Sequence, residues 1–190
     1  QLAQSDVIIS IDPHCKVYEG WENSLSDPVR NNYKTITTPR TYKLNPETWE
    51  NYDDGRDVGH KTVWGWNLDF KWSNSAGYQT PCIAGHCFAF SKKWWLESGG
   101  FDDEMKVWGG ENIEFSLKTW LCGGEVLVTD CYVSHWFKKK FQYKFGTDTL
   151  LRNKARIAEV WFEEYKHRFY KSIKKPLGSI DCGELTKKID

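Results

Sequence analysis

The sequence contains no run of apolar residues long enough to cross a lipid bilayer, and no segment with the pattern of a secretory signal peptide. It also has no surplus of charge, because 26 lysine and arginine residues balance 26 aspartate and glutamate residues. A neutral chain has no overall field that would attract nucleic acid or an anionic membrane. We therefore expect no membrane-spanning segment in this chain and no general affinity for polyanions.

The motifs of several common enzyme classes are absent as well. The six cysteines include no C-x-x-C pair, which argues against a structural zinc cluster; their even number permits disulfides without establishing them. No G-x-S-x-G occurs and no cysteine has an evident histidine partner, so nothing supports nucleophilic catalysis by serine or cysteine. The phosphate-binding patterns G-x-x-x-x-G-K-S/T and G-x-G-x-x-G are also missing.

Length and aromatic content are the positive signals of the composition. With 190 residues the chain is long enough for one ordinary domain with its own core, and we expect residues 1–190 to form a single domain. The 11 tryptophans and 16% aromatic residues favour broad apolar surfaces with polar edges over a purely aliphatic core. Such surfaces suit stacking against sugars.

The succession of expected elements predicts an α/β fold. Residues 6–12 form a short β-branched run, typical of a buried strand in a parallel sheet. Residues 27–59 are polar and rich in turn formers, so we expect mostly surface loop there, with one strand around 34–38. The remaining patterns predict extended segments at 63–72, 81–90 and 125–133, and helices at 20–25, 91–97 (with Ser91 as cap), 111–121 and 153–172.

The stretch Trp108-Gly-Gly-Glu-Asn112 combines groups that suit a polyhydroxylated ligand. Trp108 offers a flat apolar face, and Gly109 and Gly110 let the backbone approach a ligand closely. Glu111 and Asn112 add a carboxylate and an amide at the start of the helix expected at 111–121. For the next carboxylate, at position 114, we expect only a stabilising contact with the helix dipole.

Asp12 and His14 stand two residues apart, just after the first expected strand. Ligands of open α/β sheets bind outside the carboxyl ends of strands, so both side chains could turn toward one cation there. Mixed carboxylate and imidazole ligands suit Mn²⁺ or a similar divalent ion, and His135 could supply a third ligand. The alternatives are a turn-capping aspartate beside a surface histidine, and a hydrogen-bonded structural histidine at 135.

A local basic patch follows His135 in the sequence. It consists of Lys138, Lys139, Lys140 and Lys144, in a basic and aromatic stretch from 136 to 146 that we expect to be a mobile loop. Two interpretations of this patch remain: contact with phosphate, and an ordinary solvated surface.

Seven short motifs run along nearly the whole chain. They are Asp12-Pro-His14-Cys15, Trp64-Gly-Trp-Asn-Leu-Asp-Phe-Lys-Trp72, Thr80-Pro-Cys-Ile-Ala-Gly85, Trp108-Gly-Gly-Glu-Asn112-Ile-Glu114, Cys122-Gly-Gly124, Cys131-Tyr-Val-Ser-His135-Trp-Phe and Ala158-Glu-Val-Trp-Phe-Glu-Glu-Tyr165. Their order is that of the catalytic domain of polypeptide N-acetylgalactosaminyltransferases. Seven collinear motifs leave little room for chance, so the sequence closely resembles this family.

The resemblance implies a GT-A fold, a Rossmann-like α/β sheet that binds a UDP-sugar and Mn²⁺ and transfers the sugar with retention of anomeric configuration. By the same resemblance, Asp12, His14 and His135 are the metal ligands. A divalent ion that bridges the diphosphate would neutralise the charge that develops on the departing UDP. The resemblance also implies that the loop at 136–146 closes over the site, which would exclude water.

The resemblance assigns further roles around the donor sugar. Glu111 and Asn112 resemble donor-sugar and active-site contacts, and Trp108 would lie against the diphosphate and leaving group. Backbone at Ala84 and Gly85 would line the sugar pocket. The other expected substrate contacts are His86, Gly109, Gly110 and Lys138.

Four features depart from the family pattern. His86 stands where the family usually has a second glycine, which favours a narrower donor pocket and leaves open whether the donor sugar is N-acetylgalactosamine or a similar sugar. Lys138 replaces the usual arginine and keeps the charge without the two-point phosphate geometry. The chain also lacks the family's first strands, which hold uracil and ribose, and its lectin domain, so we expect the C-terminal part of the GT-A fold.

Three functions follow from these observations. The first is transfer of a sugar from a UDP-sugar to serine or threonine of polypeptides, in the Golgi lumen for a typical family member. The second keeps the chemistry but uses hydroxymethylated bases of DNA as acceptor, in a cytoplasmic viral or bacterial enzyme whose basic rim binds the polyanion. The third is a non-catalytic sugar- or nucleotide-binding remnant, against which the intact Asp12, His14, His135 and Glu111 argue.

Overall fold

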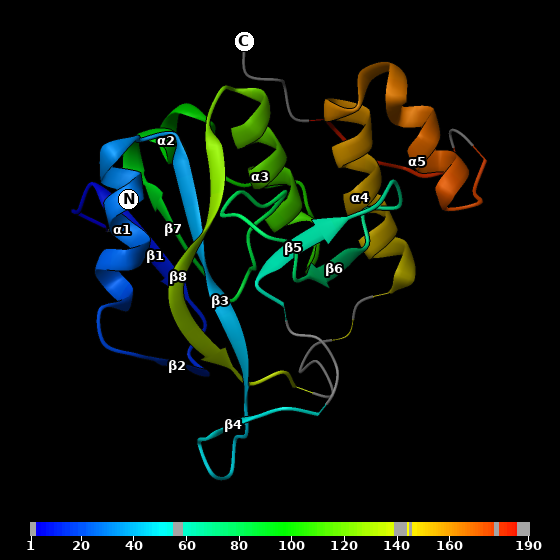
Figure 1. Cartoon of the computed structure of the whole chain (residues 1–190). Coiled ribbons are helices and arrows are strands. Elements are labelled where there is room, and N and C mark those ends of the chain that lie inside the picture. The colour runs from blue at the N-terminus through cyan, green and yellow to red at the C-terminus, as the bar shows by residue number, and fades with distance from the viewer. Residues whose placement is uncertain (1–2, 55–58, 139–143, 145, 177–178, 186–190) are drawn as a thin grey trace.

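A mixed, six-stranded sheet forms the centre of the molecule in the computed structural model (Figure 1). The structure describes residues 3–54, 59–138, 144, 146–176 and 179–185. The strands of the sheet are β1 (Val7–Ile11), β2 (Cys15–Val17), β3 (Thr35–Leu44), β4 (Asn51–Tyr52), β7 (Cys87–Ser91) and β8 (Glu125–His135). Their order is β1-β7-β3-β8-β2, with β4 paired to β3. The expected α/β fold is confirmed.

Helices pack on both faces of this sheet. Alternate residues of β7 point to opposite faces: Phe88 and Phe90 share a core cluster with Phe115 of α3 (Glu111–Leu121), whereas Cys87 and Ala89 pack with α1 (Trp21–Asn31). The helix expected at 111–121 is therefore confirmed, and α1 is longer than the expected helix at 20–25.

Strand β3 confirms the strand expected around 34–38 and continues through Leu44, into residues that were expected to be loop. It is a ten-residue strand at the centre of the sheet, and its first residues are fully buried. The threonines that suggested a loop are β-branched, and their hydroxyls find buried partners: Thr37 donates to the carbonyl of Leu25 at 2.7 Å and Thr38 to that of Cys87 at 2.9 Å. Pro39 is tolerated because the register with β8 shifts between Thr38 and Arg40.

Strand β1 differs from the buried parallel strand expected at 6–12. It pairs with β7 in the antiparallel sense, and its residues are half-buried or exposed. Only β3 and β8 run parallel among the paired strands of the described residues. A β-branched run indicates a strand but does not reveal the direction of its neighbour. The carboxyl end of β1 still delivers Asp12 to the edge of the sheet.

The C-terminal helical part packs beside a small hairpin. Strands β5 (Lys61–Trp64) and β6 (Phe70–Ser73) form a separate two-stranded sheet within the segment expected to be extended. The single helix expected at 153–172 is instead α4 (Thr147–Trp161), a short 3₁₀ turn η1 (Glu163–Tyr165) and α5 (Lys166–Ser172). Glu163 has a φ of 47°, a left-handed conformation that interrupts the helix.

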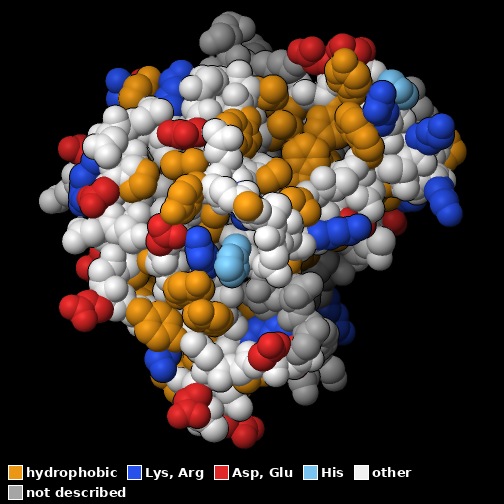
Figure 2. Space-filling model, in the orientation of Figure 1, with side chains coloured by type: hydrophobic (Ala, Val, Ile, Leu, Met, Phe, Trp, Pro, Cys, Tyr) orange, Lys and Arg blue, Asp and Glu red, His pale blue; other side chains and the backbone are white. Residues whose placement is uncertain are grey.

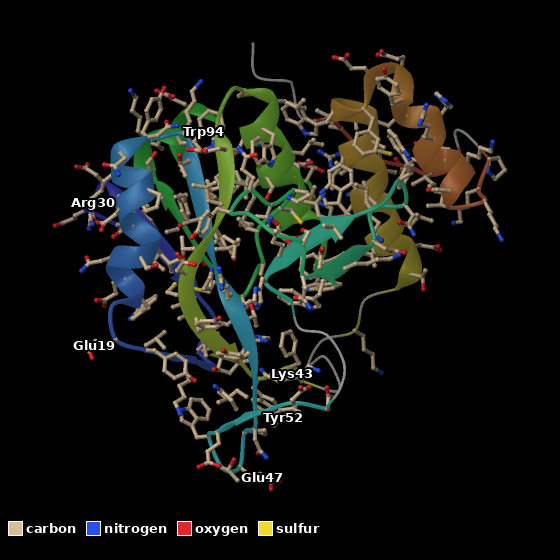
Figure 3. The ribbon with its side chains drawn as sticks, in the orientation of Figure 1. Glu19, Arg30, Lys43, Glu47, Tyr52 and Trp94 are labelled. Atoms are coloured by element: carbon tan, nitrogen blue, oxygen red, sulfur yellow. The ribbon has the colours of Figure 1, made fainter. Side chains whose placement is uncertain are left out.

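The short helix α2 (Lys92–Glu97) begins as expected. The hydroxyl of Ser91 accepts a hydrogen bond from the backbone N–H of Trp94 at 2.9 Å, which caps the helix. Trp94 itself is buried at the end of the sheet and donates from Nε1 to Thr119 Oγ1 at 2.8 Å (Figure 3). None of the helices in the described residues is long and apolar enough to span a membrane.

Candidate active site

All twelve residues that the sequence singled out line one cleft of about 980 Å³. They are Asp12, His14, Ala84, Gly85, His86, Trp108, Gly109, Gly110, Glu111, Asn112, His135 and Lys138. These residues come from the ends of β1 and β8, the start of β7 and the start of α3. The fold therefore brings together side chains that lie up to 126 positions apart, and their individual roles stay predictions.

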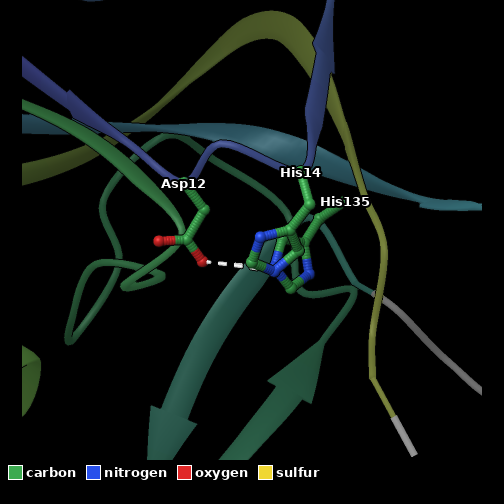
Figure 4. A group of neighbouring side chains, drawn as sticks. All are labelled: Asp12, His14 and His135. Atoms are coloured by element: carbon green, nitrogen blue, oxygen red, sulfur yellow. Dashed lines mark hydrogen bonds and ion pairs between the residues drawn. The ribbon is translucent and has the colours of Figure 1, made fainter. Parts of the chain in front are cut away.

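Three side chains with metal-binding groups converge in this cleft (Figure 4). The Nε2 atoms of His14 and His135 lie 3.1 Å apart, and Asp12 Oδ2 lies 3.3 Å from the Nε2 of His135 and 3.7 Å from that of His14. Pairing of β2 with β8 produces this geometry, because Cys15 lies opposite His135 and carries its neighbour His14 alongside.

The three groups fit a divalent cation. Ligand atoms bound to one cation at about 2.1 Å lie about 3.0–3.4 Å from one another in octahedral or tetrahedral sites, close to the separations found here. Burial is the main cause that lowers the pKa of His14 and takes that of His135 to about 4, so both imidazoles are neutral and offer lone pairs. A carboxylate and two neutral imidazoles in mutual contact repel one another unless a proton or cation lies between them.

His86 forms the base of the cleft beside these groups. Its ring centroid lies 4.8 Å from that of His135, and its Nε2 lies 3.1 Å from Thr41 Oγ1. Burial, reinforced by the two neighbouring histidines, lowers the pKa of His86 to about 3. The His86 ring is therefore a neutral, immobilised group in the space that a glycine would leave open.

The opposite wall of the cleft is the loop from Trp108 to Gly110. Gly109 and Gly110 have φ values of 94° and 107°, which favour glycine. A side chain at Gly109 would also collide with α4, because a Cβ there would lie 2.5 Å from Leu150 Cδ1. The glycine pair thus lets the chain turn tightly against α4 and leaves Trp108 partly exposed at the cleft.

Glu111 and Asn112 differ in how they are held. Within the described part of the chain, the Glu111 carboxylate takes part in no hydrogen bond or ion pair, although it faces the cleft. The Asn112 side chain donates from Nδ2 to the carbonyl of Ile83 at 3.0 Å. Asn112 therefore ties α3 to the segment that carries Ala84 and Gly85, while Glu111 is available to a ligand.

Sequence reasoning missed an ion pair at the cleft. Lys154 of α4 is almost buried, and its Nζ contacts Asp69, which precedes β6. Both residues line the cleft, together with Trp72 and Phe137. No sequence signal links Lys154 to Asp69, because 85 residues separate them and the lysine reads as the solvated face of a helix.

Glu114 and part of the basic patch also have defined positions in the structure. Glu114 lies in the first turn of α3, where the expected contact with the helix dipole applies, and it is also buried: it contacts Lys118 Nζ at 3.0 Å and accepts from Trp161 Nε1 at 3.2 Å. Lys138 of the basic patch lies at the cleft, with its Nζ 5.4 Å from the centroid of the Trp136 ring. Lys139, Lys140 and most of the expected mobile loop at 136–146 lie outside the described residues.

The chain is similar in sequence to known glycosyltransferases. A family model described as the N-terminal domain of galactosyltransferase matches residues 72–143. The chain is 34% identical, over 98% of its length, to a probable N-acetylgalactosaminyltransferase 8 of Caenorhabditis elegans, of which it covers 47%. It is 31% identical, over 100% of its length, to polypeptide N-acetylgalactosaminyltransferase 3 of Mus musculus, of which it covers 33%.

A solved structure supports the same assignment. The crystal structure of GalNAc-T7 with UDP, GalNAc and Mn²⁺ superposes with a TM-score of 0.80 at 28% sequence identity, over 94% of this chain and 36% of that one. The chain thus spans less than half the length of these relatives. Its mixed sheet with helices on both faces has the GT-A fold, and the chain is similar over nearly its whole length to members of the polypeptide N-acetylgalactosaminyltransferase family.

Proposed function

We propose that this chain carries out metal-dependent, retaining transfer of a sugar from a UDP-sugar to a hydroxyl of serine or threonine in a polypeptide. The observation that supports this function most is the shared cleft. Three metal-binding side chains line the same cleft as the Glu111 carboxylate, which has no partner among the described residues. That pairing suits a ligand with a charged diphosphate at one end and a polyhydroxylated ring at the other.

Asp12, His14 and His135 would hold Mn²⁺, which when bound supplies positive charge next to the diphosphate of the leaving group. Lys138 adds a positive charge on the same side of the cleft. Lysine contacts phosphate as a point charge, without the two-point geometry of arginine. The Lys138 ammonium would therefore contribute to diphosphate affinity rather than to its orientation.

The sugar would lie between the backbone of Ala84 and Gly85 and the loop that carries Trp108. Glu111 would accept hydrogen bonds from sugar hydroxyls, because its carboxylate faces the cleft without a partner in the described structure. Trp108, partly exposed, would cover the diphosphate end and limit access of water. Asn112 would act on the sugar site indirectly, because its side-chain amide donates a hydrogen bond to the carbonyl of Ile83.

The donor would be an N-acetylgalactosamine-like sugar, since the structure of GalNAc-T7 contains UDP, GalNAc and Mn²⁺ and the matched relatives are polypeptide transferases. The buried His86 ring narrows the space beside Gly85 and would restrict the substituents that the sugar can carry.

The uridine would need groups beyond this cleft. In the described residues, β1 pairs with β7 along one edge and has no partner along the other. A free strand edge can accept a further strand through its backbone groups. We infer that additional strands of the same fold lie along β1 and complete the nucleotide site.

Hydroxymethylated DNA is the alternative acceptor, suggested by Lys138 at the cleft. Among the described residues on the face that Figure 2 shows, acidic and basic side chains are interspersed, so these residues offer no broad cationic surface to a polyanion. A polypeptide acceptor is therefore the better supported choice.

The test is transfer from a panel of UDP-sugars, with Mn²⁺, to serine- and threonine-containing peptides and to hydroxymethylated DNA. We expect transfer to peptide and its loss in Glu111→Gln, whereas Glu97→Gln, an exposed carboxylate on α2, serves as the control. Transfer to DNA alone would overturn the peptide acceptor. Absence of both hydrolysis and transfer would indicate a binding protein without activity.

A further inference from the structure

Helix α4 lies directly against the backbone of the loop that forms one wall of the cleft. A Cβ on Gly110 would lie 3.3 Å from Ile157 Cδ1 and 3.6 Å from the Cβ of Asn153. At Gly109 the space is occupied by Leu150, as described above. Three side chains of α4, one turn apart, therefore meet the loop with no loop side chain between them.

Asn153 is the polar member of this row, and it is fully buried. Its Oδ1 accepts a hydrogen bond from the backbone N–H of Lys106 at 2.9 Å. Its Nδ2 faces three carbonyl oxygens, those of Lys106 at 2.9 Å, Trp108 at 3.2 Å and Gly109 at 2.9 Å. One amide thus hydrogen-bonds four backbone groups of this segment, one N–H and three carbonyls.

The turn needs such support because its backbone is strained. Val107 is β-branched and has a φ of 59°, a left-handed conformation that such residues rarely adopt. The N–H of Trp108 donates to the carbonyl of Lys106 at 2.7 Å, which closes a three-residue turn around Val107. Strained turns of this kind persist only where surrounding contacts over-determine them.

We propose that Asn153 is a positioning residue for sugar transfer, because its amide fixes the turn that sets the Trp108 ring and the Glu111 carboxylate at the cleft. The inference rests on the proposed function. Since the side chain is fully buried, Asn153 acts through the loop backbone and does not touch the substrate.

Asparagine is the side chain that meets this requirement. Aspartate has the same size but loses both N–H donors and brings a carboxylate toward three carbonyl oxygens. Leucine fills a similar volume but can make none of the four hydrogen bonds of the Asn153 amide. Either change would let the turn relax, and a shift of about 1 Å in groups that contact a substrate can lower the rate about 100-fold.

The experiment compares Asn153→Asp with Thr119→Val in the full protein. Thr119 is also fully buried, and its hydroxyl accepts from Trp94 Nε1 at 2.8 Å, remote from the turn. We expect both variants to lose stability. Only Asn153→Asp should lose about 100-fold in kcat/KM with the UDP-sugar donor, and its calorimetrically measured affinity for Mn²⁺ should stay at the wild-type value. Amide exchange at 106–110 should accelerate in this variant alone.

Wild-type kcat/KM in a folded Asn153→Asp variant would overturn the proposal, and so would an equal loss in Thr119→Val. If Asn153→Asp fails to fold, Asn153→Ser takes its place under the same criteria, because its hydroxyl retains one donor. A wild-type protein without donor turnover would instead contradict the proposed function, and the role of Asn153 in transfer with it.

Discussion

Arg156 and Asp102 form a two-point ion pair between α4 and the segment that leads to the cleft loop. Nε of Arg156 donates to Oδ2 of Asp102 at 2.7 Å, and Nη2 donates to Oδ1 at 2.8 Å. The exposed fractions of the two side chains are 0% and 3%. Removing either side chain of a pair this deeply buried would leave the other charge buried without compensation.

Replacing Arg156 with alanine should lower the free energy of unfolding by about 3–5 kcal/mol, because the buried carboxylate loses its partner. Arg30→Ala is the matched control. Arg30 contacts Asp27 at 2.7 Å on the outer face of α1 (Figure 3), and both side chains are more than half exposed. This control should lose less than about 1 kcal/mol. Urea unfolding measures the free energy lost in each variant. Equal losses would show that burial does not increase the contribution of the ion pair to stability.

Mn²⁺ should stabilise the folded protein, because the three ligand side chains converge only in the native structure. At a concentration about 100 times the dissociation constant, the free energy of unfolding should rise by about 2.7 kcal/mol. The rise should vanish in the double variant His14→Ala/His135→Ala and persist in His60→Ala, whose histidine is exposed. Thermal unfolding with and without Mn²⁺ measures it, and an unchanged rise in the double variant would refute the metal assignment.

His86→Gly should widen the donor pocket, because it removes a buried ring packed against His135 and bonded to Thr41. We expect kcat/KM to shift by about tenfold toward donors with a bulky substituent on the sugar ring, the scale of discrimination by pocket size. Thr41→Val removes the hydrogen bond without opening the pocket and should leave donor preference unchanged. Competition between UDP-GalNAc and UDP-galactose reports the preference; equal shifts in both variants would rule out a steric role.

Glu114 should give the protein a stability that falls as pH rises. Burial is the largest cause that raises the Glu114 pKa above its usual 4.5, and Lys118 opposes the shift only in part. The folded state therefore holds this proton at pH values where the unfolded state has released it. Stability from this group is fully present below pH 4.5 and is lost as pH rises through the raised pKa. Glu114→Gln should lack that decline in urea titrations between pH 4 and 7, and an identical decline would contradict the assignment.

Most residues of the candidate site could be predicted from the sequence, whereas the residues that hold the site in place could not. Asp12, His14, Glu111 and His135 carry recognisable chemistry in recognisable motifs, and the structure gathers them in one cleft. Asn153 and Lys154 sit on a helix where they read as surface residues. Their contacts at 106–109 and at Asp69 depend on how α4 packs, which no local pattern encodes.

The fold was predicted correctly where the apolar periodicity is strong. It was missed where contacts with neighbouring elements determine the local structure. The helix at 111–121 has an apolar face and is bounded by glycines, and its ends were found to the residue. Strand β3 was predicted only around 34–38, and its continuation to Leu44 was missed because proline and polar residues interrupt a strand pattern in isolation. The strand depends on hydrogen bonds to Leu25 and Cys87, which lie outside it, and on a register shift against β8.

The pairing of β2 with β8 also determines when the cation site can exist during folding. Cys15 pairs with His135, 120 positions further along the chain, so Asp12 and His14 cannot meet this third candidate ligand until almost three-quarters of this sequence has been synthesised and β8 has docked. Contacts of such long sequence separation form slowly, after local structure. Binding of the metal would therefore come late in folding, and it would report directly that β8 has paired with β2 in the central sheet.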